Sequence, residues 1–288
     1  MMNLYINQIK KSDFKERIYS GDIFLNTDLL ASKNICSYAK DCITEAFDGE
    51  VDHQSLHKNM HVADFVRHVT LLKNQFTNSL ISKEIIKDFV IEMGAEPRSY
   101  IFDVPRIRVV PHYDYLHAGV SYAYKPHRDT WYGSADCQIN TWMPVYTIEP
   151  DQTMMINPAY FSRPIKNTSA DWSLSDWINV QRPLAQKNIT EEQRIHPIPL
   201  EEINNESEIR VAANTGEVLI FSAAHLHGTV PNLTDKVRFS VDFRLIHTDD
   251  LQKHRGASNV DNGCNDVDAG YSSFFSANDF SKFSGVIS

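Results

Sequence analysis

From residue 100 onward the sequence changes from a helical to a strand-like pattern, and this change constrains the fold more than any other feature. Short runs rich in valine, isoleucine and aromatic residues follow one another, and Gly, Pro, Asn or Asp bound them, as is common for β-strands. Because no long helical stretch separates these runs, the pattern predicts an antiparallel sandwich or barrel rather than a parallel α/β sheet. The predicted strands cover residues 107–110, 120–124, 139–146, 217–221 and 237–246.

The part of the chain before residue 100 is predicted to be mainly helical. Apolar side chains recur there near the helical period, and Gly94 followed by Pro97 marks the end of the last predicted helix. The predicted helices cover residues 27–47, 63–80 and 82–94.

The length of the chain is compatible with one large domain. We expect residues 1–288 to form a single unit, in which residues 1–99 are the helical part and residues 100–250 the β-rich core. The tail, residues 251–288, is rich in Gly, Asn and Asp and is expected to be irregular.

A long insert interrupts the predicted core at residues 157–214. It contains five prolines together with Trp172 and Trp177, and a segment of this length inside a compact domain is usually functional. We predict a lid or substrate wall, with short helices at residues 173–180 and 191–195. The two tryptophans are equally suited to anchoring the lid and to contacting a substrate.

The composition indicates a globular protein that acts on a small molecule. Hydrophobic residues make up 42% and charged residues 23% of the chain, and its formal charge of −9 disfavours nucleic acid and anionic membranes as partners. No apolar run approaches the roughly 20 residues of a membrane helix, and the first residues lack the apolar stretch of a signal peptide, so we expect a cytoplasmic protein. Four scattered cysteines without a CxxC pair predict neither a zinc cluster nor a disulfide framework. The oligomeric state is not predicted.

Two separated motifs can supply the ligands of a metal ion. One residue separates His127 from Asp129, and His227 opens a His-Gly-Thr-x-Pro-Asn segment downstream. Two imidazoles and one carboxylate on one face of a metal leave the opposite face open, which suits a non-haem Fe(II) that performs oxygen chemistry. Arg238, eleven residues after His227, offers a planar fork for the far carboxylate of an organic acid bound at the metal.

The His-x-Asp motif is weak by itself, because the chain holds three copies and the other two begin at His112 and His247. The middle copy is favoured since a strand-like run precedes it, another follows it, and a strand, a histidine, a turn and an arginine come downstream. His225 is an alternative to His227 as the distal ligand, but the Gly-Thr-x-Pro-Asn that follows favours His227. Without that downstream segment, Asp129 would be read as the cap of a turn.

The predicted strand at residues 237–246 presents alternate side chains to the same face. Arg238 and Ser240 are therefore expected to point together into a barrel. Arg244 lies on the same face and is a rival anchor for an organic anion.

Three segments carry a resemblance to a known family. PHRDTWYG contains the His-x-Asp motif, INTWMPVY is a tryptophan-containing strand, and GEVLIFSAAHLHGTVPNLTDKVRFSVDFR joins a strand, a distal His-Gly-Thr, an asparagine at plus five and an arginine at plus eleven. In this order they resemble the phytanoyl-CoA dioxygenase-like branch of the Fe(II)/2-oxoglutarate-dependent oxygenases, over roughly residues 107–245.

The resemblance implies a mainly β fold with flanking helices and a double-stranded β-helix core of the jelly-roll or cupin type. It also implies Fe(II), 2-oxoglutarate as cosubstrate and O2, in the hydroxylation of an unactivated C–H bond of a small molecule, with succinate and CO2 as co-products. Desaturation or ring formation are alternative outcomes. Carried over by position, it assigns iron binding to His127, Asp129 and His227, and the cosubstrate pocket to Arg238, Ser240, Thr229 and Trp142. Trp142 is alternatively a simple core residue.

The chain departs from the family after the tryptophan strand. Asp151-Gln152 and Asn157-Pro158-Ala159 replace the family's Asn-Gly and Gly-Ser-His elements, so the substrate is expected to differ from an acyl-CoA. Two further functions are compatible with the same residues. One is a metal-dependent hydrolase or isomerase that uses zinc-bound water, and the other is a noncatalytic small-molecule-binding module.

Overall fold

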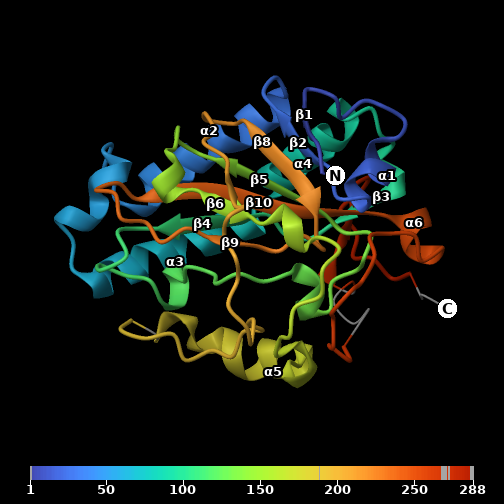
Figure 1. Ribbon diagram of the computed structural model, residues 1–288. Coiled ribbons are helices and arrows are strands. Elements are labelled where there is room, and N and C mark those ends of the chain that lie inside the picture. Colours follow the sequence, from blue (N-terminus) through green and yellow to red (C-terminus); the bar gives the residue numbers. More distant parts are fainter. Residues whose placement is uncertain (1, 188, 267–270, 272, 286–288) are drawn as a thin grey trace.

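The computed structural model describes residues 2–187, 189–266, 271 and 273–285, and Figure 1 labels its elements. Its main feature is a mixed sheet of eight strands, in which only the pair β1–β2 is parallel. The strand order is β1 (Leu4–Ile6), β2 (Ile23–Asn26), β8 (Val218–Ser222), β5 (Ile139–Pro144), β10 (Arg238–His247), β3 (Tyr100–Phe102) and β11 (Phe275–Ser276), and β4 (Arg106–Val110) also pairs with β10.

A second, smaller sheet packs against the larger one. Its strand order is β7 (Ile209–Arg210), β6 (Met154–Ile156) and β9 (His227–Thr229), and both pairs are antiparallel. A buried apolar cluster joins the two sheets, because Met154 and Ile156 of β6 pack with Trp142, Leu219 and Phe221 of the larger sheet. The space between the sheets is therefore closed by apolar packing on one side.

The alternation of side chains along β10 separates the main core from the interior between the sheets. Phe239, Val241 and Phe243 belong to the main hydrophobic core, where Phe243 makes an edge-to-face contact with Phe89 of a helix. Arg238 and Ser240 point to the opposite face, toward the smaller sheet. One strand thus contributes both to the core and to the polar interior.

Helices cover the outer face of the larger sheet. The main core contains buried residues of α2 (Leu30–Ala46), α3 (Val62–Asn78) and α4 (Leu80–Glu92) together with residues of β4, β5, β8 and β10 (Figure 1). Ser79 caps α4, since its hydroxyl accepts hydrogen bonds from the backbone amides of Ile81 and Ser82. No helix in the described ranges is both long and apolar enough to cross a membrane. The shorter helices are α1 (Phe14–Tyr19), α5 (Leu174–Asp176) and α6 (Thr248–Gln252).

The observed elements agree in part with those predicted from the sequence. The three predicted helices correspond to α2, α3 and α4, and four of the five predicted strands correspond to β4, β5, β8 and β10. The chain before residue 100 also contributes two strands, β1 and β2, to the larger sheet. The tail expected to be irregular, residues 251–288, begins within the last turn of α6 and contains the short strand β11, and its residues 267–270, 272 and 286–288 lie outside the described residues.

The strand predicted at residues 120–124 is wrong. A single 3-10 turn, Gly119–Ser121, stands there, and Gly119 has a positive φ of 58°. Side chains from the insert bind the backbone of this turn. Glu192 accepts a hydrogen bond from the Gly119 amide, and Arg194 donates one to the Gly119 carbonyl. The helix predicted at residues 191–195 is also absent, whereas the one at residues 173–180 is present as α5 followed by a π-helical turn, Trp177–Gln181.

Candidate metal centre

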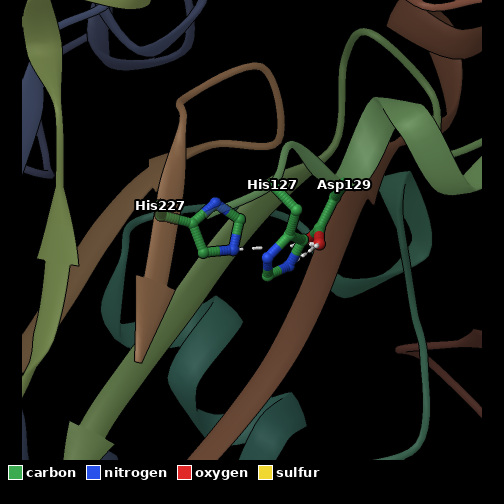
Figure 2. Close-up of side chains that lie close together, drawn as sticks. All are labelled: His127, Asp129 and His227. Atoms are coloured by element: carbon green, nitrogen blue, oxygen red, sulfur yellow. Dashed lines mark ion pairs between the residues drawn. The ribbon is translucent and has the colours of Figure 1, made fainter. Parts of the chain in front are cut away.

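The structure brings His127, Asp129 and His227 together between the two sheets (Figure 2). His227 opens β9, and the backbones of His127 and His227 exchange two N–H···O hydrogen bonds of 2.8 and 2.9 Å. Asp129 begins a single 3-10 turn whose first amide donates to the carbonyl of Ala223. Backbone pairing between these two segments therefore places side by side two histidines that are 100 residues apart in the sequence.

The three side chains present one ligand atom each to a common point. The Nε2 atoms of His127 and His227 lie 3.6 and 3.8 Å from Oδ1 of Asp129. The Nδ1 atom of His127 lies 2.7 Å from the Lys125 carbonyl, and that of His227 lies 2.9 Å from the His225 carbonyl. Because a carbonyl only accepts, Nδ1 carries the proton and Nε2 keeps its lone pair for a metal.

The surroundings of Asp129 keep it ionised. Its second oxygen, Oδ2, accepts hydrogen bonds from Gln138 (3.1 Å), Asn140 (2.8 Å) and Arg244 (3.3 Å). Burial alone would raise the pKa of Asp129, but the Arg244 guanidinium and the two neighbouring imidazoles hold it well below its usual range. Asp129 is thus an oriented carboxylate with one oxygen left for a metal.

The charge state of His227 also suits a ligand. Burial, assisted by the nearby His127, lowers the pKa of His227 to about 3, so the imidazole is neutral at physiological pH. Two imidazole nitrogens and one carboxylate oxygen, from the buried His127 and Asp129 and the half-buried His227, fit a divalent transition metal such as Fe(II).

The rival histidines do not lie at this site. Nδ1 of His112 accepts a hydrogen bond from the Asp114 amide, and the Asp114 side chain is exposed. The ring nitrogens of His225 lie near the carbonyls of Ser222 and Gly21, so this side chain is buried in the core and faces away from the triad.

A second cluster of possible ligands lies at the start of α6. His247, Asp249 and Asp250 are close together there, but cations already pair with both carboxylates. Lys15 and Arg255 bind Asp250, and Arg255 and Lys253 bind Asp249. The cluster is an ion-pair network in which Asp250 is buried and His247 and Asp249 are partly exposed.

The structure separates the two rival arginines of β10. Arg244 bridges Asp129 and Asp103, with its Nη1 atom 2.8 Å from Oδ2 of Asp103. Arg238 forms no ion pair with any described carboxylate, although its side chain is only 3% exposed. Its Nη1 atom donates to the carbonyls of Thr153 (2.9 Å) and Gln152 (3.3 Å), and no described residue accepts from its Nε atom.

The other predicted cosubstrate residues surround Arg238. The Ser240 hydroxyl is fully buried and has no hydrogen-bond partner among the described residues. The Arg238 guanidinium lies 5.9 Å from the centre of the Trp142 ring, which is itself part of the apolar cluster between the sheets. Thr229 follows His227 on the same face of β9, opposite Met154, the residue after Thr153. These contacts connect the Arg238 region to the metal ligands through the smaller sheet.

Several residues that shape the site were not predicted. Gln138 and Asn140 lie on the same face as Trp142, so the alternation along β5 was an available signal for them. Tyr124 precedes the His-x-Asp motif, and its ring centroid lies 5.5 Å from that of His127. Tyr132 lies at the same distance, but its position directly after the motif does predict a place near the pocket mouth. His196 comes from the insert, where the sequence carries no signal that it reaches the site.

Comparisons with known proteins reveal similarity only among solved structures. No protein-family profile and no curated protein matches the chain. EvdO2 from Micromonospora carbonacea var. aurantiaca, complexed with 2-oxoglutarate, is 11% identical, with a TM-score of 0.47 over 82% of this chain and 91% of that one. The non-haem monooxygenase ThoJ is 10% identical, with a TM-score of 0.46 over 76% of this chain and 70% of that one.

SnoN, a non-haem α-ketoglutarate-dependent epimerase from nogalamycin biosynthesis, is also similar. It is 10% identical, with a TM-score of 0.41 over 82% of this chain and 84% of that one. At such low identity these likenesses add no weight to a functional assignment, which rests on the residues of this chain. The resemblance to the phytanoyl-CoA dioxygenase-like branch stays a prediction.

Proposed function

We propose that this chain is a non-haem Fe(II)- and 2-oxoglutarate-dependent oxygenase that hydroxylates, or otherwise oxidises, an unactivated C–H bond of a small molecule. Succinate and CO2 are the co-products. In this proposal residues 1–288 form one domain, and the two packed sheets are a double-stranded β-helix of the jelly-roll type. His127, Asp129 and His227 hold the metal.

The observation that carries the proposal is the unpaired guanidinium of Arg238. Burial, with Arg108 nearby, lowers the pKa of Arg238 to about 10, so the side chain is still a cation at neutral pH. A buried cation without a carboxylate partner is costly, and such groups are normally paired. The missing partner is supplied when the distal carboxylate of 2-oxoglutarate binds.

The neighbours of Arg238 support the same ligand. The Ser240 hydroxyl lies on the same face of β10 and also lacks a partner among the described residues, so it can donate to the same carboxylate. Trp142 forms an apolar wall beneath the guanidinium. A zinc hydrolase that uses metal-bound water needs no such buried anion receptor.

The protein positions its reactants and excludes water. Fe(II), when bound, would supply the activation of O2, while the residues of the chain hold and orient the metal and the cosubstrate. Gln138, Asn140 and Arg244 fix the orientation of Asp129, while Lys125 and His225 fix the two imidazoles through their carbonyls. Arg238, Ser240 and Thr229 orient the cosubstrate, and the apolar cluster around Trp142 keeps that pocket dry.

An anaerobic titration tests the proposal. Protein mixed with Fe(II) and 2-oxoglutarate is expected to develop a weak visible charge-transfer band that neither addition gives alone. The Asp129→Ala variant, folded as judged by circular dichroism, is expected to lack the band. Binding of zinc with no response to 2-oxoglutarate would instead support a hydrolase or isomerase, and binding of neither would support a noncatalytic module.

A further inference from the structure

Six aromatic or imidazole rings gather beside the metal ligands and join the insert to the rest of the protein. Tyr122, Tyr124 and Tyr132 flank the His-x-Asp motif, and Trp172, Trp177 and His196 come from the insert, residues 157–214. We refer to these six residues as the ring cluster.

The imidazole of His196 lies at the centre of the ring cluster. Tyr122 stacks on it with a centroid separation of 4.4 Å and an interplanar angle of 16°, and Trp177 approaches within 4.9 Å. Nδ1 of His196 lies 3.0 Å from the hydroxyl of Tyr132. These contacts fix the orientation of His196.

The ring cluster is adjacent to the candidate metal centre. The rings of Tyr124 and Tyr132 each lie 5.5 Å from the ring of His127, and both also contact His196. In Figure 1 the part of the insert around α5, in yellow, lies away from the two sheets, and the ring cluster joins this part to the site. A molecule held by these rings is next to the metal ligand.

Two buried nitrogen atoms of the ring cluster lack hydrogen-bond partners. No described residue bonds Nε1 of Trp172 or Nε2 of His196, and both side chains are only 7% exposed. Leaving a polar group buried and unpaired is energetically unfavourable. Unpaired groups of this kind are rare and call for a partner, such as a bound ligand. Trp172 contacts Tyr132 at a centroid distance of 5.3 Å, so both nitrogens belong to side chains that touch the same tyrosine.

The charges around the ring cluster are balanced. Arg194 lies over the rings of Tyr122 and Trp177, but it pairs with Glu192 at 2.6 Å. Arg108 lies over Tyr124 and pairs with Asp242. The charges nearest to the rings therefore select neither an anion nor a cation.

One further amine lies nearby. Lys73 of α3 donates to the Val120 carbonyl, and burial, with Arg108 next in importance, lowers its pKa to about 7. Its charge is therefore only partial near neutral pH, and the surroundings of the ring cluster remain close to neutral.

We propose that the ring cluster binds the substrate, and that this substrate is an uncharged ring compound bearing hydroxyl groups. The Trp172 N–H donates to an oxygen of the ligand, and Nε2 of His196 exchanges a hydrogen bond with a hydroxyl. The aromatic rings of the cluster provide an apolar wall against which a ring compound can pack. The statement that this ligand is the substrate rests on the function proposed above, whereas its binding to the ring cluster does not require turnover.

Sugars and phenols are two classes of compound that fit this description. The experiment is saturation-transfer NMR on the protein loaded anaerobically with Fe(II) and 2-oxoglutarate, with methyl glycosides in one arm and simple phenols in the other. One class is expected to bind, which identifies the source. Binding of neither class overturns the proposal.

Variants then locate the binding. Trp172→Phe keeps a ring and removes the N–H, and His196→Phe keeps a ring and removes both nitrogens. Loss of one hydrogen bond of about 0.5–1.5 kcal/mol predicts a roughly two- to tenfold weaker Kd for each variant. His61→Phe, at an exposed position before α3, is the matched control and is expected to bind as the wild type does.

Unchanged affinity in both ring-cluster variants overturns the proposal. Thermal melting identifies any variant that fails to fold, and each of the two variants tests the claim by itself. If the band from Fe(II) and 2-oxoglutarate forms but no ring compound binds, this inference fails while the proposed function stands. If ring compounds bind but the band does not form, the proposed function fails while the ligand-binding role of the ring cluster stands.

Discussion

Replacement of Arg238 by methionine separates the cosubstrate site from the metal site. The side chain is 3% exposed, and burial with Arg108 nearby lowers its pKa to about 10, which corresponds to about 3 kcal/mol of unfavourable free energy for the cation. Methionine removes this cost and also removes the two hydrogen bonds to the carbonyls of Gln152 and Thr153. Charged hydrogen bonds are worth about 1.5–3 kcal/mol each, so the opposing terms are similar and the free energy of unfolding is expected to change by no more than about 3 kcal/mol.

The same replacement is expected to have a large effect on 2-oxoglutarate. Removing one member of a buried charge pair typically costs about 2–5 kcal/mol, which weakens binding about thirtyfold to a few thousandfold. Arg238→Lys is expected to restore only part of the affinity, because an ammonium lacks the bidentate fork of a guanidinium.

Anaerobic calorimetry of 2-oxoglutarate binding to the Fe(II)-loaded protein measures this effect. Arg210→Met, on β7 of the smaller sheet, is the matched control, since Arg210 is partly exposed and already pairs with Glu208. The reasoning is refuted if Arg238→Met binds 2-oxoglutarate as tightly as the wild type, or if it loses Fe(II) as well.

Three further predictions concern the metal ligands, their support and the insert. Asp129→Ala is expected to abolish Fe(II) binding, measured by equilibrium dialysis, whereas Asp114→Ala, in the copy that begins at His112, is expected to leave it intact. The opposite result would show that the metal binds at the His112 copy. Arg244→Leu leaves Asp129 without its guanidinium, whereas Asp103 keeps its ion pair with Arg106, so we expect about 10- to 100-fold weaker Fe(II) binding and a stability loss of about 3–5 kcal/mol in urea; unchanged Fe(II) affinity would show that Arg244 does not orient the ligand. Residues 160–200 are expected to gain hydrogen-exchange protection when a ring compound binds, and equal protection with and without ligand would make the insert a static wall.

The sequence was sufficient to predict the three residues that the structure brings together. The context of the middle His-x-Asp copy, the downstream His-Gly-Thr segment and the family resemblance singled out His127, Asp129 and His227. The strand expected before His127 is absent, and backbone pairing with His227 holds this residue in place instead. The choice between His225 and His227 depended on the segment after them, and the structure places His225 in a turn that buries its ring in the core.

The choice between Arg238 and Arg244 as the anchor of the organic anion requires the register of the sheet. Both lie on one face of β10, and alternation cannot tell which end of that face lies at the metal. The pairing of Arg244 with Asn140 on β5 brings Arg244 beside Asp129, and this pairing joins residues about a hundred positions apart.

One physical cause explains both the absence of the predicted strand at residues 120–124 and the unpredicted position of His196 beside the metal ligands. The backbone at Gly119 is bound by Glu192 and Arg194 of the insert rather than by a neighbouring strand. Local propensity favours a strand there, but these side-chain contacts outweigh it. Long-range contacts of an irregular insert leave no periodic signal in the sequence.

The fate of labelled oxygen tests the central claim most directly. Wild-type protein with Fe(II), 2-oxoglutarate and ascorbate under ¹⁸O₂ is expected to form succinate in which one carboxylate oxygen carries the label, because the lost carboxyl group leaves as CO2 and one atom of O2 enters the new carboxylate. The second oxygen atom enters a hydroxylated substrate or, with ascorbate as the electron donor, is reduced to water. Succinate without label, or no more succinate than Asp129→Ala forms over the same incubation, would contradict the proposed function.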